Sequence, residues 1–354
     1  MVFLNRLKIA ILFGGASFEH EVSLQSAYNV IKNLKEEYYL VPIGITKTGN
    51  WFYYDGDIEK IKSGQWEKEN CPRVVVGMDK DGAGILKFEE NGKIDFLEVD
   101  CFFAVLHGQN GEDGKMQSIF EMNKVPYVGC NSLSSMICMN KVLTRTILDK
   151  HGIKGTKWIG LKKNEIDDLE EKALEIAKYL KFPIFTKPAS CGSSVGIKKC
   201  KDLQELKKGI LYALEFEDEL ICEAFVNGKE VECAVLGGKS AKASVVGQII
   251  SYGEFYDYDS KYKEDSKLLI PADVNDDVAK KIKQIAVKVF KIMGCYGLSR
   301  VDFFVDADDE IFLNEINTMP GFTDISMYPM LWKKSGISYK ELLKILIDLA
   351  MERG

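Results

Sequence analysis

SRVDFFVDADDEIFLNEINTMPGFT, residues 299–323, is the stretch that decides the fold of this chain. Two runs rich in apolar residues, 301–305 and 310–316, have the length of strands and are joined by a short acidic connection. This pattern predicts a pair of neighbouring antiparallel strands. The loop over 317–323 contains Pro and Gly, so we predict a rigid turn. Such a turn could present backbone N–H groups to a developing oxyanion, and a plain turn is equally consistent with it.

Polar side chains interrupt this apolar strand pair. With a connection over roughly 306–311, Asp302 lies opposite Glu315. Asn317 leaves the same face as Glu315, because side chains two apart in a strand point the same way. Oxygens of Asp, Glu and Asn suit Mg²⁺ that is shared with phosphates, and Arg300 lies beside them. The alternative is a solvent-facing polar strip on an edge strand, but the apolar surroundings favour the metal site.

A second candidate site lies upstream in FPIFTKPASCGSSVGIKKC (182–200), which predicts a strand, a Gly/Ser turn and a strand. Lys187 offers a positive charge to an anion, and Ser193 and Ser194 offer hydroxyl donors. An ordinary Gly/Ser turn with a solvated lysine explains the segment as well. Around it we expect a small α+β section with helices at 141–151, 164–180 and 202–215 and a strand at 219–224.

The N-terminal third alternates strand and helix. Residues 9–13 form a short apolar run that ends in two glycines, and apolar residues then recur at helical spacing over 27–34. Further strands are predicted at 39–45 and 102–106. The order of strand, Gly turn, helix and strand is typical of a parallel α/β unit.

Two loops of this unit carry polar residues at the carboxyl ends of predicted strands, where α/β proteins usually bind ligands. GGASFEHEVS (14–23) holds Glu19 and Glu21, which would attract an ammonium group. The alternative is that both only favour the positive end of a helix dipole. HGQNGEDG (107–114) begins with His107, which is either part of a site or a spare side chain in a polar loop.

The C-terminal third begins with a predicted strand at 231–236. Residues 252–269 are polar, Tyr-rich and charged, which in a compact protein indicates a functional lid or a disordered insert. Apolar residues over 278–293 recur at helical spacing, and 339–352 is predicted to be the last helix.

Composition limits the function classes. The 47 Lys and Arg against 53 Asp and Glu give a net charge of −6, so we expect no nucleic-acid partner. No run of about 18 apolar residues occurs, so we expect no membrane span. The nine cysteines form no CxxC pair and the three histidines have no metal-ligand spacing. We therefore expect free thiols in a reducing cytoplasm and no zinc site.

Common nucleotide-binding loops are missing. GKS at 238–240 has the ending of a phosphate-binding loop, but position 233 is Cys where that loop requires Gly. No GxGxxG opens a helix after a predicted strand. Binding of ATP or NAD by these two loops is therefore disfavoured.

Six segments in order resemble the motifs of the D-alanine–D-alanine ligase family, within the ATP-grasp superfamily. They are LFGGASFEHEVSLQSA, LHGQNGEDGKMQ, MNKVLTR, FTKPASCGSSVGI, EFYDYDSKY and SRVDFFV…LNEINTMPGFTDISMYP. The resemblance extends over nearly the whole chain. It implies an N-terminal parallel α/β domain and a two-part ATP-grasp fold: residues 1–125, a central subdomain over 126–222, and a C-terminal subdomain over 223–354 with a lid loop at 250–270.

The resemblance also implies the binding residues for ATP and metal. ATP would lie between two antiparallel sheets, with Lys141 and Lys187 on its phosphates. Two Mg²⁺, with Mn²⁺ as a substitute, would be bound by Asp302, Glu315 and Asn317. The residues matched to adenine and ribose contacts are Glu223, Phe225, Val226 and Glu230.

The same resemblance implies the chemistry of two D-alanine molecules. Glu19 would bind the first ammonium and form a hydrogen-bonded triad with Ser193 and Tyr262, and His107 would lie nearby. The first carboxylate would attack the γ-phosphate, and the second amine would attack the resulting acyl phosphate. The oxyanion donors would be Arg300 and the Gly321 N–H, and the second D-alanine would contact Ser326, Met327 and Lys261.

The second substrate is expected to be D-alanine, for peptidoglycan precursor synthesis, with D-serine as the alternative. EFYDYDSKY has the Tyr-bearing lid of the D-alanine enzymes, and Val195 stands where resistance ligases usually have Phe. Some D-serine enzymes share this lid. Asn140 is a departure, because most members have Asp before the motif lysine, and Lys115-Met116 replaces the usual Thr-Leu. A homodimer is the family expectation.

Overall fold

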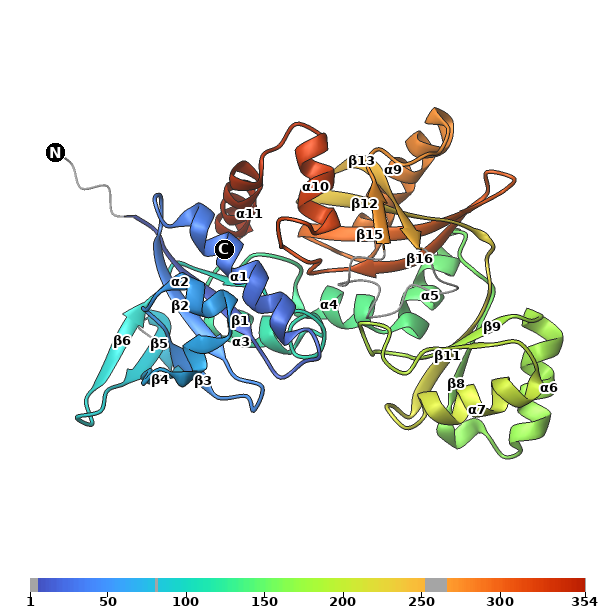
Figure 1. Cartoon of the computed structure of the whole chain (residues 1–354), viewed down its shortest axis with the longest axis horizontal. Helices are drawn as coiled ribbons and strands as arrows, with labels where there is room; N and C mark the ends of the chain where they lie inside the picture. The colour runs from blue at the N-terminus through green and yellow to red at the C-terminus, as the bar shows by residue number, and fades with distance from the viewer. Residues whose placement is uncertain (1–5, 80–81, 252–265, 354) are drawn as a thin grey trace.

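The computed structural model describes residues 6–79, 82–251 and 266–353. These residues form sheets of seven, four and five strands. Figure 1 shows an elongated molecule with the seven-stranded sheet at one end and the four-stranded sheet at the other. In this part of the chain, no helix has the length and apolar character needed to cross a membrane. The domain boundaries near 125 and 223 stay a prediction.

The seven-stranded sheet has the order β6-β5-β4-β3-β2-β1-β7. It is parallel where β1 lies between β2 and β7, as predicted, and β1 is apolar because both of its faces are covered. The other strand pairs are antiparallel, so the predicted N-terminal α/β domain is confirmed with a mixed sheet that is parallel only around β1. Short connections allow only antiparallel pairing between β2 and β3, between β4 and β5, and between β5 and β6, whereas α2 and η1 lie between β3 and β4. The strands are β1 (Lys8–Gly14), β2 (Tyr39–Ile45), β3 (Trp51–Tyr53), β4 (Arg73–Asp79), β5 (Gly82–Phe88), β6 (Ile94–Glu98) and β7 (Cys101–Ala104).

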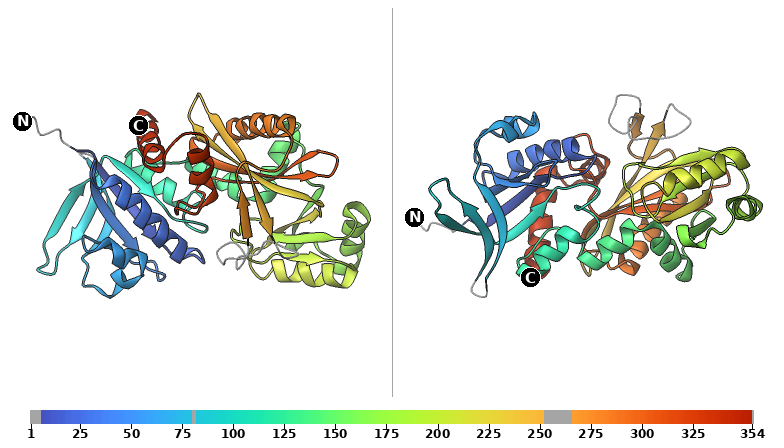
Figure 2. Two further views of the ribbon diagram at one scale, coloured as in Figure 1. Left: turned by 45° about the horizontal axis from the view of Figure 1, so that its top comes forward. Right: turned by 90° about the horizontal axis from the view of Figure 1, so that it is seen from below.

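Helices from both ends of the chain cover this sheet. The helix α1 packs on β1, and the C-terminal helix α11 lies beside α1 and β7 (Figures 1 and 2). Their apolar faces share one core, which explains why the last helix belongs spatially to the N-terminal sheet. The helices of this region are α1 (His20–Leu34), α2 (Ile58–Lys62), the 3₁₀ helix η1 (Gln65–Lys68), α3 (Lys115–Asn123) and α11 (Tyr339–Arg353).

The four-stranded sheet is antiparallel, with the order β10-β9-β11-β8. Two helices, α6 and α7, bury one of its faces with a small apolar core. The opposite face carries Lys187 on β9 and Glu223 on β11, because both alternate with buried apolar residues. The elements are α4 (Ser132–Met139), α5 (Lys141–Lys150), β8 (Trp158–Lys162), η2 (Lys163–Glu165), α6 (Leu169–Leu180), β9 (Ile184–Pro188), β10 (Lys198–Cys200), α7 (Leu203–Ala213) and β11 (Glu219–Ala224).

The five-stranded sheet is antiparallel, with the order β14-β13-β12-β15-β16. The helix α9 packs against one face, and α10 packs against part of the other. Val301, Phe303 and Val305 of β15 face α9, so alternation places Arg300 and Asp302 on the opposite face. The elements are β12 (Gly228–Gly237), β13 (Lys242–Ser251), β14 (Ser266–Leu269), α9 (Asp276–Ile292), β15 (Gly297–Asp306), β16 (Ile311–Asn317) and α10 (Met327–Lys334).

Most predicted elements are confirmed, with shifts of a few residues at their ends. The long helix predicted over 164–180 begins only at Leu169, after η2, because Asp168 accepts hydrogen bonds from the first N–H groups. The segment 252–269 was expected to be irregular, yet its last four residues form β14 against β13. The remainder, 252–265, lies outside the described residues.

Candidate active site

A row of carboxylates crosses three strands of the five-stranded sheet. Glu232 on β12 is the register partner of Asp302 on β15, and Asp302 is the partner of Glu315 on β16. Register partners project from one face, so three carboxylates are neighbours. Glu232 and Asp302 are only 3% and 2% exposed. The predicted juxtaposition of Asp302 and Glu315 is confirmed, and we call Glu232, Asp302 and Glu315 the carboxylate row.

Arg300 provides the positive charge beside the carboxylate row. Its Nε and Nη2 each donate a hydrogen bond of 2.8 Å to Asp302, and Nε lies 3.0 Å from Glu232 Oε2. Burial disfavours the charged guanidinium, but Asp302 and Glu232 outweigh burial and hold the pKa of Arg300 above its usual range. The residue predicted to donate to an oxyanion is therefore held rigidly and charged.

The donor set of the carboxylate row fits a divalent cation. Asn317 Nδ2 lies 2.9 Å from Asp302 Oδ2 and 3.5 Å from Glu315 Oε1, so three oxygen-bearing side chains converge. Three carboxylates against one guanidinium leave excess negative charge on a buried face, which a cation would neutralise. No three His, Cys, Asp or Glu side chains of the described residues already surround one metal position. Phosphate oxygens of a bound nucleotide would have to complete the coordination.

Lysines from the central section lie opposite the row. A pocket is lined by Lys141 and Lys187 on one side and by Glu315 and its strand neighbours on the other. Lys141 Nζ donates to the carbonyl of Cys191 at 2.8 Å, which ties the lysine to the Gly/Ser turn. Burial lowers the pKa of Lys141, while the nearby Glu315 opposes this shift. Two lysines facing the carboxylate of Glu315 can hold a polyphosphate with its cation.

Glu223, predicted to contact adenine or ribose, is held by three side chains of the protein. Its Oε1 accepts hydrogen bonds from Arg145 Nη2 at 2.6 Å and Thr156 Oγ1 at 3.0 Å, and Oε2 lies 2.6 Å from Lys187 Nζ. Burial would raise the pKa of Glu223, but Lys187 and Arg145 hold it well below its usual range. Arg145 also donates to the carbonyl of Leu313 on β16, so it links both sheets.

Arg145 was missed by the sequence analysis, although it lies in the quoted motif MNKVLTR. The available signal was its helical position, four residues after Lys141 and therefore on the same face of α5. Arg145 is 2% exposed and forms an ion pair with Glu223 at 2.6 Å. We call Arg145, Thr156, Lys187 and Glu223 the nucleotide-side cluster.

The other residues matched to adenine and ribose lie where β11 passes into β12. Phe225 and Val226 occupy the short link between these strands, and Phe225 remains 40% exposed. The ring of Phe225 lies 6.1 Å from that of Phe185. Glu230 follows on β12. The link joins the two sheets on either side of the pocket, which suits a flat, partly apolar ligand.

The Gly/Ser turn meets a loop of the N-terminal sheet. Ser193 and Ser194 both have positive φ, an uncommon backbone conformation for residues other than glycine. Ser193 Oγ is buried without a hydrogen-bond partner among the described residues. A Cβ placed on Gly192 would lie 3.8 Å from the Cα of Gly108, and one on Gly108 would lie 2.9 Å from Glu19 Oε2. The predicted neighbours Glu19 and Ser193 are therefore brought to one region.

Family models match both parts of the chain. The D-ala D-ala ligase N-terminus matches residues 8–130, and the D-ala D-ala ligase C-terminus matches residues 147–348. The chain belongs to the D-Ala–D-Ala ligase family. The D-alanine–D-alanine ligase of Acetivibrio thermocellus is 45% identical, with 99% of this chain and 97% of that protein covered. D-alanine–D-alanine ligase B of Clostridium tetani is 43% identical, with 99% and 95% covered.

Solved structures of family members superpose over the whole chain. The D-alanine–D-alanine ligase from Coxiella burnetii has a TM-score of 0.87 at 34% identity and covers 99% of this chain and 95% of its own. The VanG D-Ala:D-Ser ligase from Enterococcus faecalis has a TM-score of 0.88 at 40% identity and covers 98% and 99%. The resemblance in the six motifs thus corresponds to a shared fold of the ligase family.

His107, which the ligase resemblance puts near the first substrate, is 3% exposed. Its Nδ1 donates to the carbonyl of Met319 at 3.1 Å, and its Nε2 accepts from Ser26 Oγ at 3.0 Å. Burial lowers the pKa of His107. This neutral histidine therefore connects the N-terminal sheet to the loop after β16.

The loop after β16 is held by its own side chains. Ser326 Oγ accepts the backbone N–H of Thr323 at 3.0 Å, and a Cβ on Gly321 would lie 2.8 Å from the same oxygen. Met327, at the start of α10, is 6% exposed. The predicted oxyanion donor Gly321 and the predicted second-site residues Ser326 and Met327 are therefore neighbours. Tyr262 and Lys261 lie outside the described residues.

Asn140 accounts for a departure from the ligase motif. Its Oδ1 accepts the N–H of Leu143 and caps α5, while its Nδ2 donates to Glu219 at 3.0 Å and to Ser190 at 3.3 Å. A carboxylate at this position could form the cap but could not donate to Glu219. The amide thus connects the start of the lysine-bearing helix to the Gly/Ser turn.

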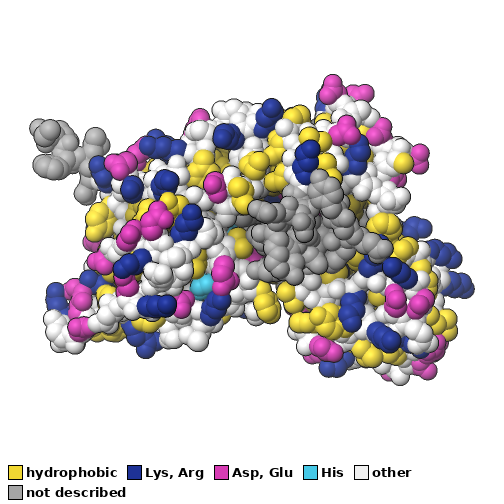
Figure 3. All heavy atoms as spheres, viewed as in Figure 1, with side chains coloured by type: hydrophobic (Ala, Val, Ile, Leu, Met, Phe, Trp, Pro, Cys, Tyr) yellow, Lys and Arg dark blue, Asp and Glu magenta, His cyan; other side chains and the backbone are white. Residues whose placement is uncertain are grey.

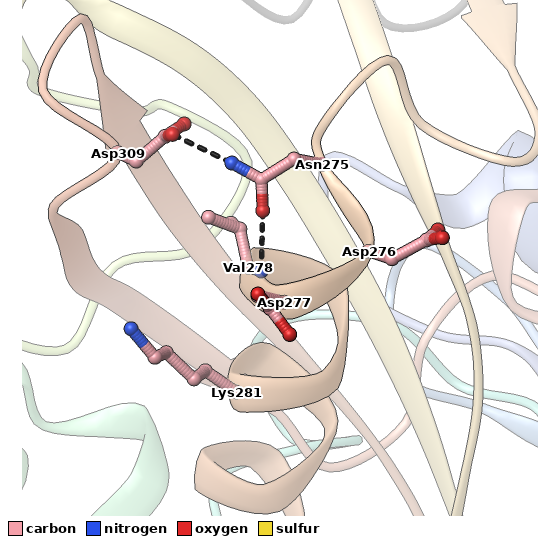
Figure 4. A pocket seen from close by; sticks show the side chains of 6 residues that line it. All are labelled: Asn275, Asp276, Asp277, Val278, Lys281 and Asp309. Carbon is pink, nitrogen blue, oxygen red and sulfur yellow. Dashed lines mark hydrogen bonds between the residues drawn. The ribbon is translucent and has the colours of Figure 1, made fainter.

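A surface hollow lies apart from these residues, at the start of α9 (Figure 4). Asn275 caps the helix by accepting from the N–H of Val278, and it donates to Asp309 at 2.6 Å. Asp309 belongs to the turn of the β15–β16 hairpin, opposite the end that carries Arg300. Helix capping explains the first contact, and the second is a hydrogen bond between two exposed side chains. The face in Figure 3 shows Lys and Arg interspersed with Asp and Glu, in line with the net charge of −6.

Proposed function

We propose that this chain joins two D-alanine molecules into D-alanyl-D-alanine, for peptidoglycan precursor synthesis, through an acyl-phosphate intermediate. The family to which it belongs consists of ATP-dependent ligases that use a divalent cation. The observation that carries the proposal is the pocket in which Lys141 and Lys187 face Glu315 of the carboxylate row. Phosphoryl transfer needs this combination, because it depends on positioning and on neutralising charge.

ATP would bind between the four-stranded and five-stranded sheets. Lys141 and Lys187 would contact its phosphates. Adenine would lie against Phe225 and Val226, and Glu230 would accept from the ribose. Glu223 supports this site by holding Lys187, and one of its oxygens can also accept from the amino group of adenine.

Asp302, Glu315 and Asn317 would hold two Mg²⁺, with Mn²⁺ as an alternative ion. The bound cation would supply charge neutralisation to the phosphates. For Asn317 this requires that its amide oxygen, rather than Nδ2, faces the site. The convergence of the three side chains within 3.5 Å supports this assignment.

The first D-alanine would bind near the meeting point of the Gly/Ser turn and the Gly108 loop. Glu19 would bind its ammonium group, and Ser193 and Tyr262 would orient Glu19 by hydrogen bonds. The buried Ser193 Oγ, without a partner among the described residues, supports such a role. Neutral His107 fixes the adjoining loops. The carboxylate of this D-alanine would attack the γ-phosphate and release ADP.

The second D-alanine would attack the acyl phosphate with its amine, after the amine has lost a proton. Arg300 and the Gly321 N–H would stabilise the tetrahedral oxyanion, and inorganic phosphate would leave. Ser326 and Lys261 would bind the second carboxylate, and Met327 would contact its side chain. The close contact between Gly321 and Ser326 supports one site for both functions.

We also propose a reducing cytoplasmic location and a homodimer. The nine cysteines are all free thiols, and seven of them are buried, which supports a reducing compartment. The dimer follows from the family expectation alone and is tested by light scattering.

D-Serine is retained as a second candidate for the second substrate, because the VanG D-Ala:D-Ser ligase is 40% identical. The experiment measures ADP release with D-alanine alone and then with D-serine added, and identifies the dipeptides by mass spectrometry. We expect ADP and D-alanyl-D-alanine from D-alanine alone. Absence of ADP release under that condition would refute the proposal. Preferred formation of D-alanyl-D-serine would instead favour the second candidate.

A further inference from the structure

Glu232 is the member of the carboxylate row that the sequence did not identify. It lies on β12, with 4% of its side chain exposed, and its Oε2 is 3.0 Å from Nε of Arg300. The strand register fixes this contact, because Glu232 is the direct partner of Asp302 and Arg300 lies two residues before Asp302. Glu232 therefore approaches the guanidinium from the neighbouring strand.

Asp302 has two competing tasks. Both of its oxygens accept hydrogen bonds from Arg300, at 2.8 Å each. The proposed function also requires Asp302 to bind a divalent cation. A carboxylate oxygen drawn toward a cation loses strength as a partner of a guanidinium, because the cation withdraws its charge.

Glu232 is not subject to this competition to the same degree. Its Oε2 forms an ion pair with the Nε side of Arg300, and β15 lies between β12 and β16, the strand that carries Glu315 and Asn317. Nη1 of Arg300 makes no hydrogen bond within the described residues, and this edge is the one left to meet an oxyanion. A guanidinium that lost Asp302 without a second carboxylate could rotate about its long side chain.

We propose that Glu232 is a positioning residue that holds the Nε edge of Arg300 while Asp302 binds the cation, so that Nη1 stays directed at the reacting carbonyl. This inference rests on the proposed function. Glu232 itself touches neither substrate nor cation. Its effect is exerted through the orientation of Arg300, on the second half-reaction, in which the amine attacks the acyl phosphate.

The test is the substitution Glu232→Gln, which preserves the shape of the side chain and removes its charge. We expect kcat for dipeptide formation to fall about 10–100-fold, with the KM for ATP within about twofold, because an oxyanion donor would be misaligned while nucleotide contacts remain. ADP release should fall less than dipeptide formation, since stranded acyl phosphate is hydrolysed by water. The control is Glu310→Gln, which removes the same charge from an exposed ion pair with Lys154 at the far end of β16. The control should retain wild-type activity.

Three further measurements separate positioning from general stability. Glu232→Asp should recover part of kcat, and Glu232→Gln in an Arg300→Lys background should cost much less than in the wild type. The melting temperature of Glu232→Gln should not fall, since removing one of three adjacent buried carboxylates relieves repulsion. A change in the Mg²⁺ concentration needed for half-maximal rate, additive effects with Arg300→Lys, or unchanged coupling of ADP to dipeptide would each overturn the proposal. Failure of the proposed function would be distinct, because the wild type itself would then form no dipeptide.

Discussion

The two charged groups on either side of the pocket, the nucleotide-side cluster and the carboxylate row, are built in opposite ways. In the nucleotide-side cluster, the single carboxylate of Glu223 is surrounded by Arg145, Thr156 and Lys187. In the carboxylate row, three carboxylates share one guanidinium. The first group is complete without any ligand, so it stabilises the fold and fixes a pocket wall. The second carries excess negative charge that a bound cation would neutralise. Repulsion within the carboxylate row therefore lowers the stability of the unliganded protein, in exchange for a cation-binding site.

The largest expected effect comes from weakening the carboxylate row. Glu315→Gln should lower kcat on the order of 10³-fold, because a lost cation ligand removes several kcal/mol of charge stabilisation. Without Mg²⁺ the variant should unfold at the same or a higher temperature than the wild type, since repulsion with Asp302 is relieved. ADP-release kinetics and melting curves with and without Mg²⁺ test both parts. A tenfold or smaller loss of kcat with unchanged Mg²⁺ dependence would contradict the assignment.

The nucleotide-side cluster should respond in the reverse manner. Arg145→Met leaves Glu223 buried with one fewer cation, and breaking a buried pair typically costs about 3–5 kcal/mol. We expect a large loss in the free energy of unfolding by urea and a raised KM for ATP, with D-alanine binding affected less. Lys154→Met, which breaks an exposed ion pair with Glu310, is the control and should cost about 1 kcal/mol or less. Equal losses in the free energy of unfolding for the two variants would contradict the stabilising role of the nucleotide-side cluster.

The alternation of apolar and polar residues is sufficient to predict part of the carboxylate row. Alternation over 301–317 and a short connection placed Asp302 opposite Glu315, as the structure has it. Glu232 could not be added from the sequence, because its place beside Asp302 depends on which strand pairs with the other edge of β15. That choice is made by packing against α9 and α10.

The other side could not be predicted for a related reason. Besides Lys187 on the neighbouring strand β9, Glu223 has partners from α5 and from the segment before β8, which approach only through tertiary packing. The docking of α11 on the N-terminal sheet is likewise a long-range outcome. Helical and strand periodicities fix elements, and they do not fix which elements meet.

Asn140 tests whether the carboxylates near the nucleotide-side cluster each need a hydrogen-bond donor. Its Nδ2 is the donor to Glu219. Asn140→Asp retains the cap of α5 and replaces the donor to Glu219 with a second carboxylate. We expect a loss of about 1 kcal/mol in the free energy of unfolding at pH 7, since a hydrogen bond is lost and like charges meet. The loss should shrink near pH 4, where carboxylates protonate. Asn140→Ser keeps a cap and removes the donor to Glu219 without adding charge, so its loss in the free energy of unfolding should not depend on pH. If both variants show the same dependence on pH, repulsion between carboxylates is not the cause.

The last prediction concerns a fourth carboxyl near the row, Glu112. Its Oε1 accepts the N–H of Gly108 at 2.9 Å, and burial, aided by the charges of Glu19 and Glu315, raises its pKa to about 8. The unfolded carboxyl titrates near pH 4.3, so between about pH 4.3 and 8 the folded state holds the extra proton. Stability contributed by this group therefore falls as pH rises through that range and is constant above it.

Glu112→Gln should remove this decline and leave the melting temperature of the variant less dependent on pH between 5 and 8 than that of the wild type. The exposed Glu310→Gln should run parallel to the wild type. Saturating Mg²⁺ and ADP should reduce the wild-type decline, because a cation beside Glu315 lowers the local negative potential that helps to raise the pKa of Glu112. If the melting temperatures of Glu112→Gln and the wild type change in parallel with pH, the pKa of Glu112 is not raised by the carboxylate row. A decline unaffected by Mg²⁺ would assign the raised pKa of Glu112 to burial and Glu19, without a contribution from the carboxylate row.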